Sequence, residues 1–220
     1  MSRYKGRGKE VHDSQAHTGI LLTNLGTPDE PTPKALRRYL REFLSDPRVV
    51  EIPRLVWLLI LHGIILRVRP AKSAKLYQSI WTDEGSPLLV ISKKQQQKLA
   101  QQIQKDYGDE VIVDIAMRYG QPSIKDALQR FQAQGLKKII VLPLYPQYAG
   151  PTTASTFDAV TNEIKQWRWI PQLHFISAYH DNAQYIQALV NSINEHIAVK
   201  GKPDKLVFSY HGMPQLFHDR

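Results

Sequence analysis

The sequence predicts an α/β protein built on a parallel β-sheet. Five short segments rich in isoleucine, valine and leucine show little alternation of apolar and polar residues, and helical stretches separate them. Strands that are buried on both faces and joined by right-handed crossovers have this pattern. The predicted strands are Gly19–Leu25, Val111–Met117, Lys138–Pro143, Leu173–Ala178 and Lys205–Tyr210.

Residues 1–16 are predicted to form a disordered basic tail ahead of the first strand. Four cations, Arg3, Lys5, Arg7 and Lys9, lie in this tail, and it lacks the apolar region of a secretory signal. The formal net charge of the chain is +9, which would suit anionic lipid, nucleic acid or an acidic small molecule. Because the other charges are scattered and form no stripe with interleaved aromatic residues, the pattern argues against nucleic acid.

The segments between the strands carry helix start and stop signals. Thr32 before Pro33 predicts an N-cap with proline at the first helical position. Gly135 and Gly201 stand where helices are expected to end. Capping-box spacings predict three further starts, at Ser123 with Asp126, Ser155 with Asp158 and Asp181 with Gln184.

Two of the intervening segments have a distinctive composition. Lys93–Tyr107 is rich in glutamine and predicts a long surface helix with Leu99 and Ile103 facing inward. Leu55–Leu66 is the most apolar stretch, flanked by arginines at 54, 67 and 69, and it is shorter than the roughly 20 residues that span a bilayer. Its periodicity favours a buried core helix, and the alternative is an apolar lip that contacts a membrane or a flat apolar ligand.

The composition also limits the chemistry. With 42% hydrophobic residues in 220, the chain can bury a core. It has no cysteine, which excludes disulfides, thiolate metal sites and an iron–sulfur cluster held by these residues. A nucleotide-binding Rossmann protein is a weak candidate, because Gly26 alone falls short of the glycine-rich fingerprint and no Walker A sequence is present.

Ligands of parallel α/β sheets bind beyond the carboxyl ends of the strands, so the residues that follow each strand are the candidates for a site. Gly, Pro, Tyr, Thr and one His are concentrated there, and these segments contain Arg118, Tyr148 and His211. Each residue has an ordinary structural explanation as well: Arg118 as a surface cation, Tyr148 as a half-buried aromatic, and His211 as a hydrogen-bonded core histidine.

Taken together, these segments resemble the ferrochelatases, and the resemblance runs from about Thr18 to the last residue. The matching motifs occur in the same order and at similar spacing as in that family. They are Ile20–Pro28, Phe43–Val50, Gly85–Leu88, Met117–Ser123, Val141–Tyr148 and Ser209–Pro214.

The resemblance implies a chelatase-like fold of two similar α/β domains with a porphyrin cleft between them. Residues 17–169 would form the first domain, and residues 170–220 would begin a second domain that this sequence leaves incomplete. It further implies an enzyme that inserts Fe(II) into protoporphyrin IX to form heme, the last step of heme biosynthesis, in the cytoplasm. The iron is a substrate, and no prosthetic group is expected.

The resemblance also assigns site residues. His211 matches the active-site histidine, as a proton acceptor or as a ligand of the incoming iron. Arg118 and Tyr119 match a pair that lines the porphyrin pocket, where the guanidinium would meet a propionate. Leu25, Tyr148, Thr152 and Thr153 are the further porphyrin-contacting candidates, with an anion held at the two threonine amides; Leu25 stands where some relatives have tyrosine and offers no axial ligand.

The second site residue of the family is a glutamate far toward the C-terminus, and this chain has no counterpart to it. We therefore expect the 220 residues alone to be nearly inactive and poorly stable. Two alternatives stay open: a porphyrin- or heme-binding fragment without catalysis, and an enzyme that uses coproporphyrin III. Peripheral contact with the inner membrane through residues 55–66 is a further expectation.

Overall fold

The computed structural model describes residues 4–6 and 18–218, which divide into two compact units, residues 1–177 and 178–220. The first unit contains a four-stranded parallel sheet in the order β2-β1-β3-β4. Its strands are β1 (Thr18–Thr27), β2 (Val111–Gly120), β3 (Lys138–Pro143) and β4 (Gln172–Phe175). The predicted parallel α/β fold is thus confirmed.

The strand bounds differ from the prediction where pairing extends or stops. β1 and β2 continue beyond Leu25 and Met117 because Gly26 pairs with Tyr119 and Thr27 with Gly120. Arg118 and Tyr119 therefore lie on the strand itself. β4 is an edge strand that ends at Phe175, and it pairs only with Lys138–Val141 of β3. The predicted domain boundary at residues 169 and 170 stays a prediction, while β4 belongs to this sheet.

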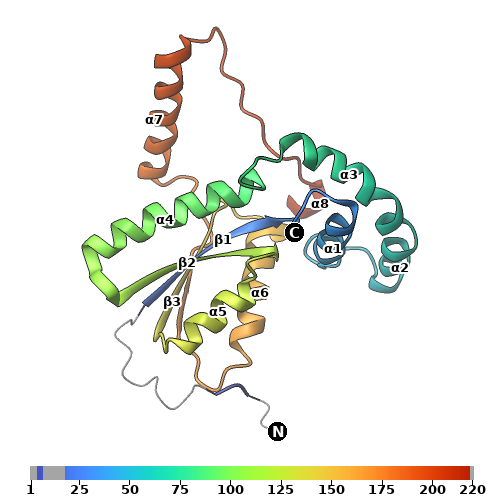
Figure 1. Cartoon of the computed structure of the whole chain (residues 1–220), viewed down its shortest axis with the longest axis horizontal. Coiled ribbons are helices and arrows are strands. Elements are labelled where there is room, and N and C mark those ends of the chain that lie inside the picture. The colour runs from blue at the N-terminus through green and yellow to red at the C-terminus, as the bar shows by residue number, and fades with distance from the viewer. Residues whose placement is uncertain (1–3, 7–17, 219–220) are drawn as a thin grey trace. The chain divides into compact units, whose positions relative to one another are not determined.

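Helices cover both faces of the sheet (Figure 1). Neighbouring strand residues point in opposite directions, so both faces carry apolar side chains that helices bury. On one face, Leu21 and Val141 pack with α5 (Ile124–Ala133) and α6 (Ser155–Ile164). On the other, Leu22 and Val113 pack against α4 (Pro87–Tyr107). The predicted inward positions Leu99 and Ile103 are confirmed, and the helix begins earlier than predicted, at Pro87. A short 3-10 turn, Gly108–Glu110, leads from α4 into β2.

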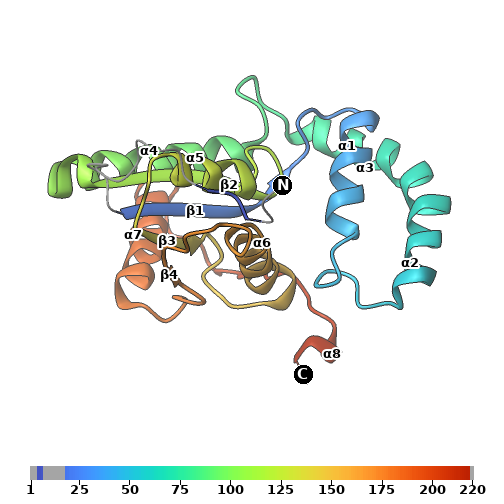
Figure 2. The same ribbon diagram turned by 90° about the horizontal axis from the view of Figure 1, so that it is seen from below.

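The segment between β1 and α4 forms a helical layer beyond the carboxyl end of β1 (Figure 2). It contains α1 (Pro33–Leu44), α2 (Arg54–Ile60), a π-helical turn η1 (Leu61–Ile65) and α3 (Leu66–Ile80). Trp57, Leu61 and Leu66 are buried in a cluster with Leu36 and Tyr119. The expectation of a wholly buried core helix at Leu55–Leu66 is wrong, because Leu55 and Leu59 are 81% and 77% exposed.

Local signals set most helix ends. The hydroxyl of Thr32 accepts the amide of Ala35, and the hydroxyl of Ser123 accepts that of Asp126, as predicted. Gly135 and Gly201 end helices at φ values of 71° and 88°. Ser155 is not an N-cap, because a π-helical turn η3 (Gly150–Ala154) precedes α6 and the Ser155 hydroxyl bonds elsewhere.

The second unit contains α7 (Ala183–Lys200) and the short α8 (Gln215–His218). Asn182, rather than Asp181, caps α7: its side chain accepts the amides of Gln184 and Tyr185. The predicted strand Lys205–Tyr210 is wrong in this structure, where that segment is exposed coil. A strand needs a neighbouring backbone to satisfy its amides and carbonyls, and the described part of this unit contains no other strand.

Most of the predicted N-terminal tail lies outside the described residues. Tyr4–Gly6 are described, and Lys5 forms a backbone bridge with Trp167 and an ion pair with Glu163. No described helix is both long enough and apolar enough to cross a membrane.

Candidate functional site

The carboxyl ends of β1 and β2 approach each other very closely. Gly26 has a φ of +112°, and a Cβ at that position would lie 1.8 Å from the carbonyl oxygen of Tyr119. Only glycine tolerates both conditions. This contact brings the first strand end against Arg118 and Tyr119, which the sequence analysis had named as candidate site residues.

Asp46 lies at the centre of a hydrogen-bond network beyond these strand ends. Its Oδ2 accepts three side-chain donors: Arg118 Nη2 at 2.5 Å, Tyr119 Oη at 2.8 Å and Ser155 Oγ at 2.6 Å. Its Oδ1 accepts the amide of Arg48 at 2.8 Å. The Asp46 side chain is only 5% exposed, and these protein donors take the place of water around its carboxylate.

The hydrogen bonds decide the charge of this carboxyl. Burial alone would raise the pKa of Asp46, yet donors from Ser155, Arg48 and Tyr119, together with the charge of Arg118, hold that pKa below its ordinary value. Asp46 is thus an anion at neutral pH. Burial raises the pKa of the Tyr119 hydroxyl, so Tyr119 stays a protonated donor.

Arg118 is held on two sides. Its Nε donates to the carbonyl oxygen of Ser155 at 2.9 Å and to the hydroxyl at 2.7 Å, while Nη2 donates to Asp46. The guanidinium carbon also lies 4.4 Å from the centroid of the Tyr119 ring. The alternative that Arg118 is a plain surface cation is wrong, because its side chain is 18% exposed and paired with a buried carboxylate.

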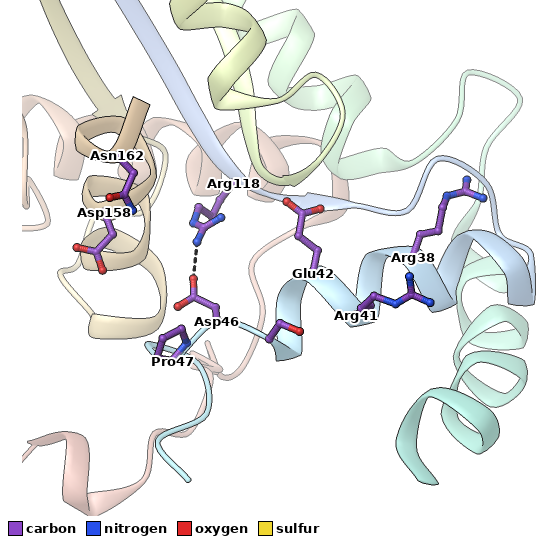
Figure 3. Close-up of a pocket in the computed structure, with 9 residues that line it drawn as sticks. Arg38, Arg41, Glu42, Asp46, Pro47, Arg118, Asp158 and Asn162 are labelled. Atoms are coloured by element: carbon purple, nitrogen blue, oxygen red, sulfur yellow. Dashed lines mark hydrogen bonds and ion pairs between the residues drawn. The ribbon is translucent and has the colours of Figure 1, made fainter. Parts of the chain in front are cut away.

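Arg118 and Asp46 line a cavity of about 750 Å³ between α1 and α6 (Figure 3). The α1 side contributes Arg38, Arg41 and Glu42, and the α6 side contributes Asp158 and Asn162. The acidic groups on these two helices already have partners: Asp158 forms an ion pair with Arg48, and Glu42 accepts a hydrogen bond from the amide of Gly120. Most of the side chains that line the cavity are charged or polar, and they include charges of both signs.

The remaining porphyrin-contacting candidates differ in how far they are exposed to solvent. Tyr148 is 59% exposed, Leu25 is partly buried against the α1–α3 cluster, and Tyr119 is fully buried. The amides of Thr152 and Thr153 both donate to the carbonyl oxygen of Ala149, so these amides are not free to hold an anion. Direct contact of any of these side chains with a porphyrin stays a prediction.

His211 belongs to the second unit. Its side chain is exposed, so it is not a core histidine, and it follows extended coil rather than the predicted strand. Nδ1 lies 2.7 Å from the carbonyl oxygen of Gly212. Since a carbonyl only accepts, the proton of the neutral ring is on Nδ1, and Nε2 keeps its lone pair. The described residues contain no cluster of three potential metal-ligating side chains.

Asp46 and Ser155 are the two site residues that the sequence analysis missed. Asp46 appeared only as one letter of the Phe43–Val50 motif, and Ser155 was interpreted as a helix cap. The available signal was an aspartate in a largely apolar stretch just after a helix, which indicates a buried partner only when a cation is known to be near. Arg118 lies 72 residues away and Ser155 lies 109 residues away.

The fold and this network define an α/β protein with a candidate ligand site at the carboxyl ends of parallel strands. The ferrochelatase family model matches residues 17–220. Ferrochelatase 2 of Shewanella oneidensis is 60% identical over 204 residues, covering 93% of this chain and 62% of that protein. The chain belongs to the ferrochelatase family.

Two further relatives give the same result. The ferrochelatase of Shewanella denitrificans is 58% identical over 209 residues, which are 93% of this chain and 62% of that protein. The ferrochelatase of Thioalkalivibrio sulfidiphilus is 53% identical over 215 residues, which are 98% of this chain and 58% of that protein. The chain thus spans about three fifths of the length of these curated relatives.

Proposed function

We propose that the protein carrying these residues is a ferrochelatase that inserts Fe(II) into protoporphyrin IX to form heme. The observation that carries the proposal is the family match over residues 17–220, which includes the Arg118 and His211 motifs. The carboxylate-bound, partly exposed Arg118 supports it, because it lies beside a cavity lined mostly by charged and polar side chains. The nucleotide-binding alternative is disfavoured, because the sequence contains no glycine-rich phosphate loop.

The reaction replaces two pyrrole protons of the porphyrin with one Fe(II), so two protons must leave the macrocycle and the iron must lose its water. A neutral imidazole suits both tasks near pH 7, because it accepts a proton or binds a borderline metal. We assign this role to Nε2 of His211, since Nδ1 already donates to Gly212. Bending the macrocycle in a cleft would aim its nitrogen lone pairs at the metal.

Arg118 would bind a propionate of the porphyrin. A guanidinium and a carboxylate form charge-assisted hydrogen bonds, which contribute about 1–3 kcal/mol each when water is excluded. Because Nε and Nη2 already bond to Ser155 and Asp46, the propionate would be received mainly at Nη1. This makes Arg118 a binding residue, while His211 performs the chemistry.

The experiment that tests this function compares the 220-residue chain with a hybrid. In the hybrid, the C-terminal segment of ferrochelatase 2 from Shewanella oneidensis follows Arg220. We expect the hybrid to insert Fe(II) and the 220-residue chain to shift the porphyrin Soret band with little insertion. A hybrid that folds and binds no porphyrin would contradict the proposal. Turnover of the 220-residue chain near that of the hybrid would contradict the expected need for further residues.

We propose protoporphyrin IX as the substrate because the residues of the Asn24–Pro28 and Pro143–Tyr148 motifs resemble those of the protoporphyrin-using branch of the family. Competition between protoporphyrin IX and coproporphyrin III in the hybrid tests this assignment. A higher kcat/KM for coproporphyrin III than for protoporphyrin IX would show that the protein belongs to the coproporphyrin-using branch, and the reaction would still be Fe(II) insertion.

We also propose a cytoplasmic location with peripheral membrane contact through residues 55–66. Six apolar side chains on α2, η1 and the start of α3 are exposed; they are Leu55, Val56, Leu59, Ile60, Ile64 and Val68. Exposed arginines at 54, 67 and 69 flank them and suit anionic headgroups.

Flotation with vesicles of phosphatidylethanolamine and phosphatidylglycerol at low salt tests this contact. Leu59→Asp should reduce the bound fraction several-fold. Leu76→Asp is the matched control, because Leu76 is equally exposed, at 72%, and lies outside residues 55–66. Absence of vesicle binding by the unmodified chain at low salt would refute the contact.

A further inference from the structure

Arg118 owes its orientation to groups from two other segments of the chain. The loop after α1 provides Asp46, and the first turn of α6 provides both acceptors of Ser155. Tyr119, the next residue on β2, bonds to the same Asp46 oxygen and stacks its ring near the guanidinium. A flexible arginine is therefore fixed from three directions before any ligand arrives.

The same contacts decide which donors stay available. A guanidinium has five N–H groups in a rigid plane. The bonds to Ser155 and Asp46 occupy Nε and one hydrogen of Nη2, and Nη1 takes part in neither. The fixed edge of the guanidinium thus leaves its far end, with Nη1, for a ligand in the cavity that Arg118 lines.

Two cations of the cavity, Arg118 and Arg41, can offer donors to an anionic group. Asp46 compensates the charge of Arg118, so this partly exposed arginine does not depend on a ligand for a counter-charge. Arg41 lines the same cavity, and it forms no ion pair with another described residue. A carboxylate that enters would find the remaining donors of Arg118 together with this second cation.

We propose that Asp46 and Ser155 are positioning residues, which hold the Arg118 guanidinium so that its Nη1 end receives a carboxylate of the porphyrin. The inference rests on the proposed function, because the porphyrin supplies the carboxylate. Asp46 and Ser155 do not touch the substrate. They act through Arg118 by removing the rotamer freedom that a long arginine would otherwise lose on binding.

Asp46→Asn and Ser155→Ala test the two supports separately. In Asp46→Asn, an amide replaces one carboxylate oxygen, so its N–H₂ group faces either the three donors at Oδ2 or the amide of Arg48. Ser155→Ala is milder, since it removes one hydroxyl and leaves the carbonyl oxygen that Nε also contacts. If Asp46→Asn fails to fold, Ser155→Ala still decides the question.

Arg48→Gln is the matched control. Arg48 and Asp158 form an exposed ion pair that joins the same loop to the same helix, without contacting Arg118. The backbone amide of Arg48 still bonds to Asp46 in this variant. A general loosening of the loop against α6 would therefore affect the control as well.

The readout is the preference for free carboxylates, measured by fluorescence titration of protoporphyrin IX and of its dimethyl ester in the same detergent. The 220-residue chain and the hybrid are titrated in parallel. We expect the unmodified protein to prefer the free acid about ten-fold, as one charge-assisted pair implies, and Arg118→Leu to lose this preference. Asp46→Asn and Ser155→Ala should lose most of it, with ester affinity within two-fold, and Arg48→Gln should keep it.

The outcomes separate the two proposals. If neither protein binds either porphyrin, the proposed function is contradicted. If the unmodified protein binds both porphyrins equally, Arg118 receives no carboxylate and the positioning role is refuted. An unchanged preference in Asp46→Asn and Ser155→Ala, or an equal loss of affinity for acid and ester, refutes it too. Additional loss in the double variant Arg118→Leu/Ser155→Ala would show that Ser155 acts independently of Arg118.

Discussion

At the scale of single residues, Asp46 is a buried anion that the fold must keep ionised. Burial raises its pKa, but hydrogen bonds from Ser155, Arg48 and Tyr119 and the charge of Arg118 together lower that pKa below the ordinary 3.8. A carboxyl whose pKa is lower in the folded state stabilises the fold above the unfolded-state pKa. That stabilisation is lost as the pH falls through the folded-state pKa.

Asp46→Asn should therefore change the acid sensitivity of the fold. We expect the variant to be less stable at pH 7 by about 3 kcal/mol, because a buried charge partner of Arg118 is removed. The difference in free energy of unfolding from the unmodified chain should shrink as the pH falls below about 3.8. Urea unfolding at a series of pH values measures it. A difference that is constant down to acid pH would show that the charge of Asp46 does not matter.

His211 is tested by its removal from the hybrid. His211→Ala should lower Fe(II) insertion by about 10²–10⁴-fold, the usual contribution of a positioned proton acceptor, with porphyrin affinity within two-fold. His196→Ala is the control, because His196 is another exposed histidine of the same unit, on α7. Near-normal insertion by His211→Ala would remove this residue from the mechanism.

At the scale of elements, the pairing of β1 with β2 depends on one glycine. Gly26→Ala would place a methyl group 1.8 Å from the backbone of Tyr119 at a φ of +112°. We expect a loss of more than about 3 kcal/mol in free energy of unfolding, from overpacking and strain together. Gly63→Ala is the control: Gly63 lies in η1 with open space around it, and alanine should stabilise the chain by about 0.5–1 kcal/mol.

Thermal and urea unfolding of both glycine variants measure the difference. Equal stability of Gly26→Ala and the unmodified chain would mean that the strand ends separate easily. In that case the approach of β1 to Tyr119 would not help to hold the site. The matched pair distinguishes this contact from a general effect of replacing glycine.

The apolar segment at Leu55–Leu66 shows why periodicity was insufficient at this scale. Apolar residues surround the helix axis on all sides, so the pattern indicated burial on every side. In the structure Trp57, Leu61 and Leu66 are buried and Leu58 and Ile65 pack partly against the same cluster, because the sheet and α1 cover one side. Which side is covered depends on the path of the chain, and no local pattern contains that information.

At the scale of the whole molecule, the two units differ in how much they bury. The sheet of the first unit buries residues such as Leu21, Ile139 and Val141 completely. In the second unit, α7 has no buried residue, and Ile186, Leu189 and Val190 are at least 40% exposed. Helices without tertiary packing are marginal in water, so we expect the second unit to open at much lower free energy than the sheet.

Amide hydrogen exchange tests this expectation. In the 220-residue chain, amides of α7 should exchange at least about a hundred-fold faster than those of β1, given the wide range of local opening energies in proteins. In the hybrid, α7 should become protected as its apolar side chains gain partners. Equal protection of α7 and β1 in the 220-residue chain would contradict the division into a firm and a weak unit.

Much of the first unit was predictable from local patterns. The four strands of the sheet, the caps at Thr32 and Ser123 and the helix end at Gly135 follow from residues close together in the chain, as does the end of α7 at Gly201 in the second unit. The errors occur where distant contacts decide: the extension of β2 through Arg118, the bond of Ser155 to Asp46, and the unpaired segment Lys205–Tyr210.

The sequence by itself determined the family, the α/β class and Arg118 as a residue of interest, because motifs and burial patterns are local properties of the chain. Only the tertiary structure decided the strand order β2-β1-β3-β4 and the meeting of Asp46, Arg118 and Ser155. Those residues come from three separate segments. Hydrogen bonds between such distant groups depend on how the helices pack on the sheet, and that packing is a property of the whole chain.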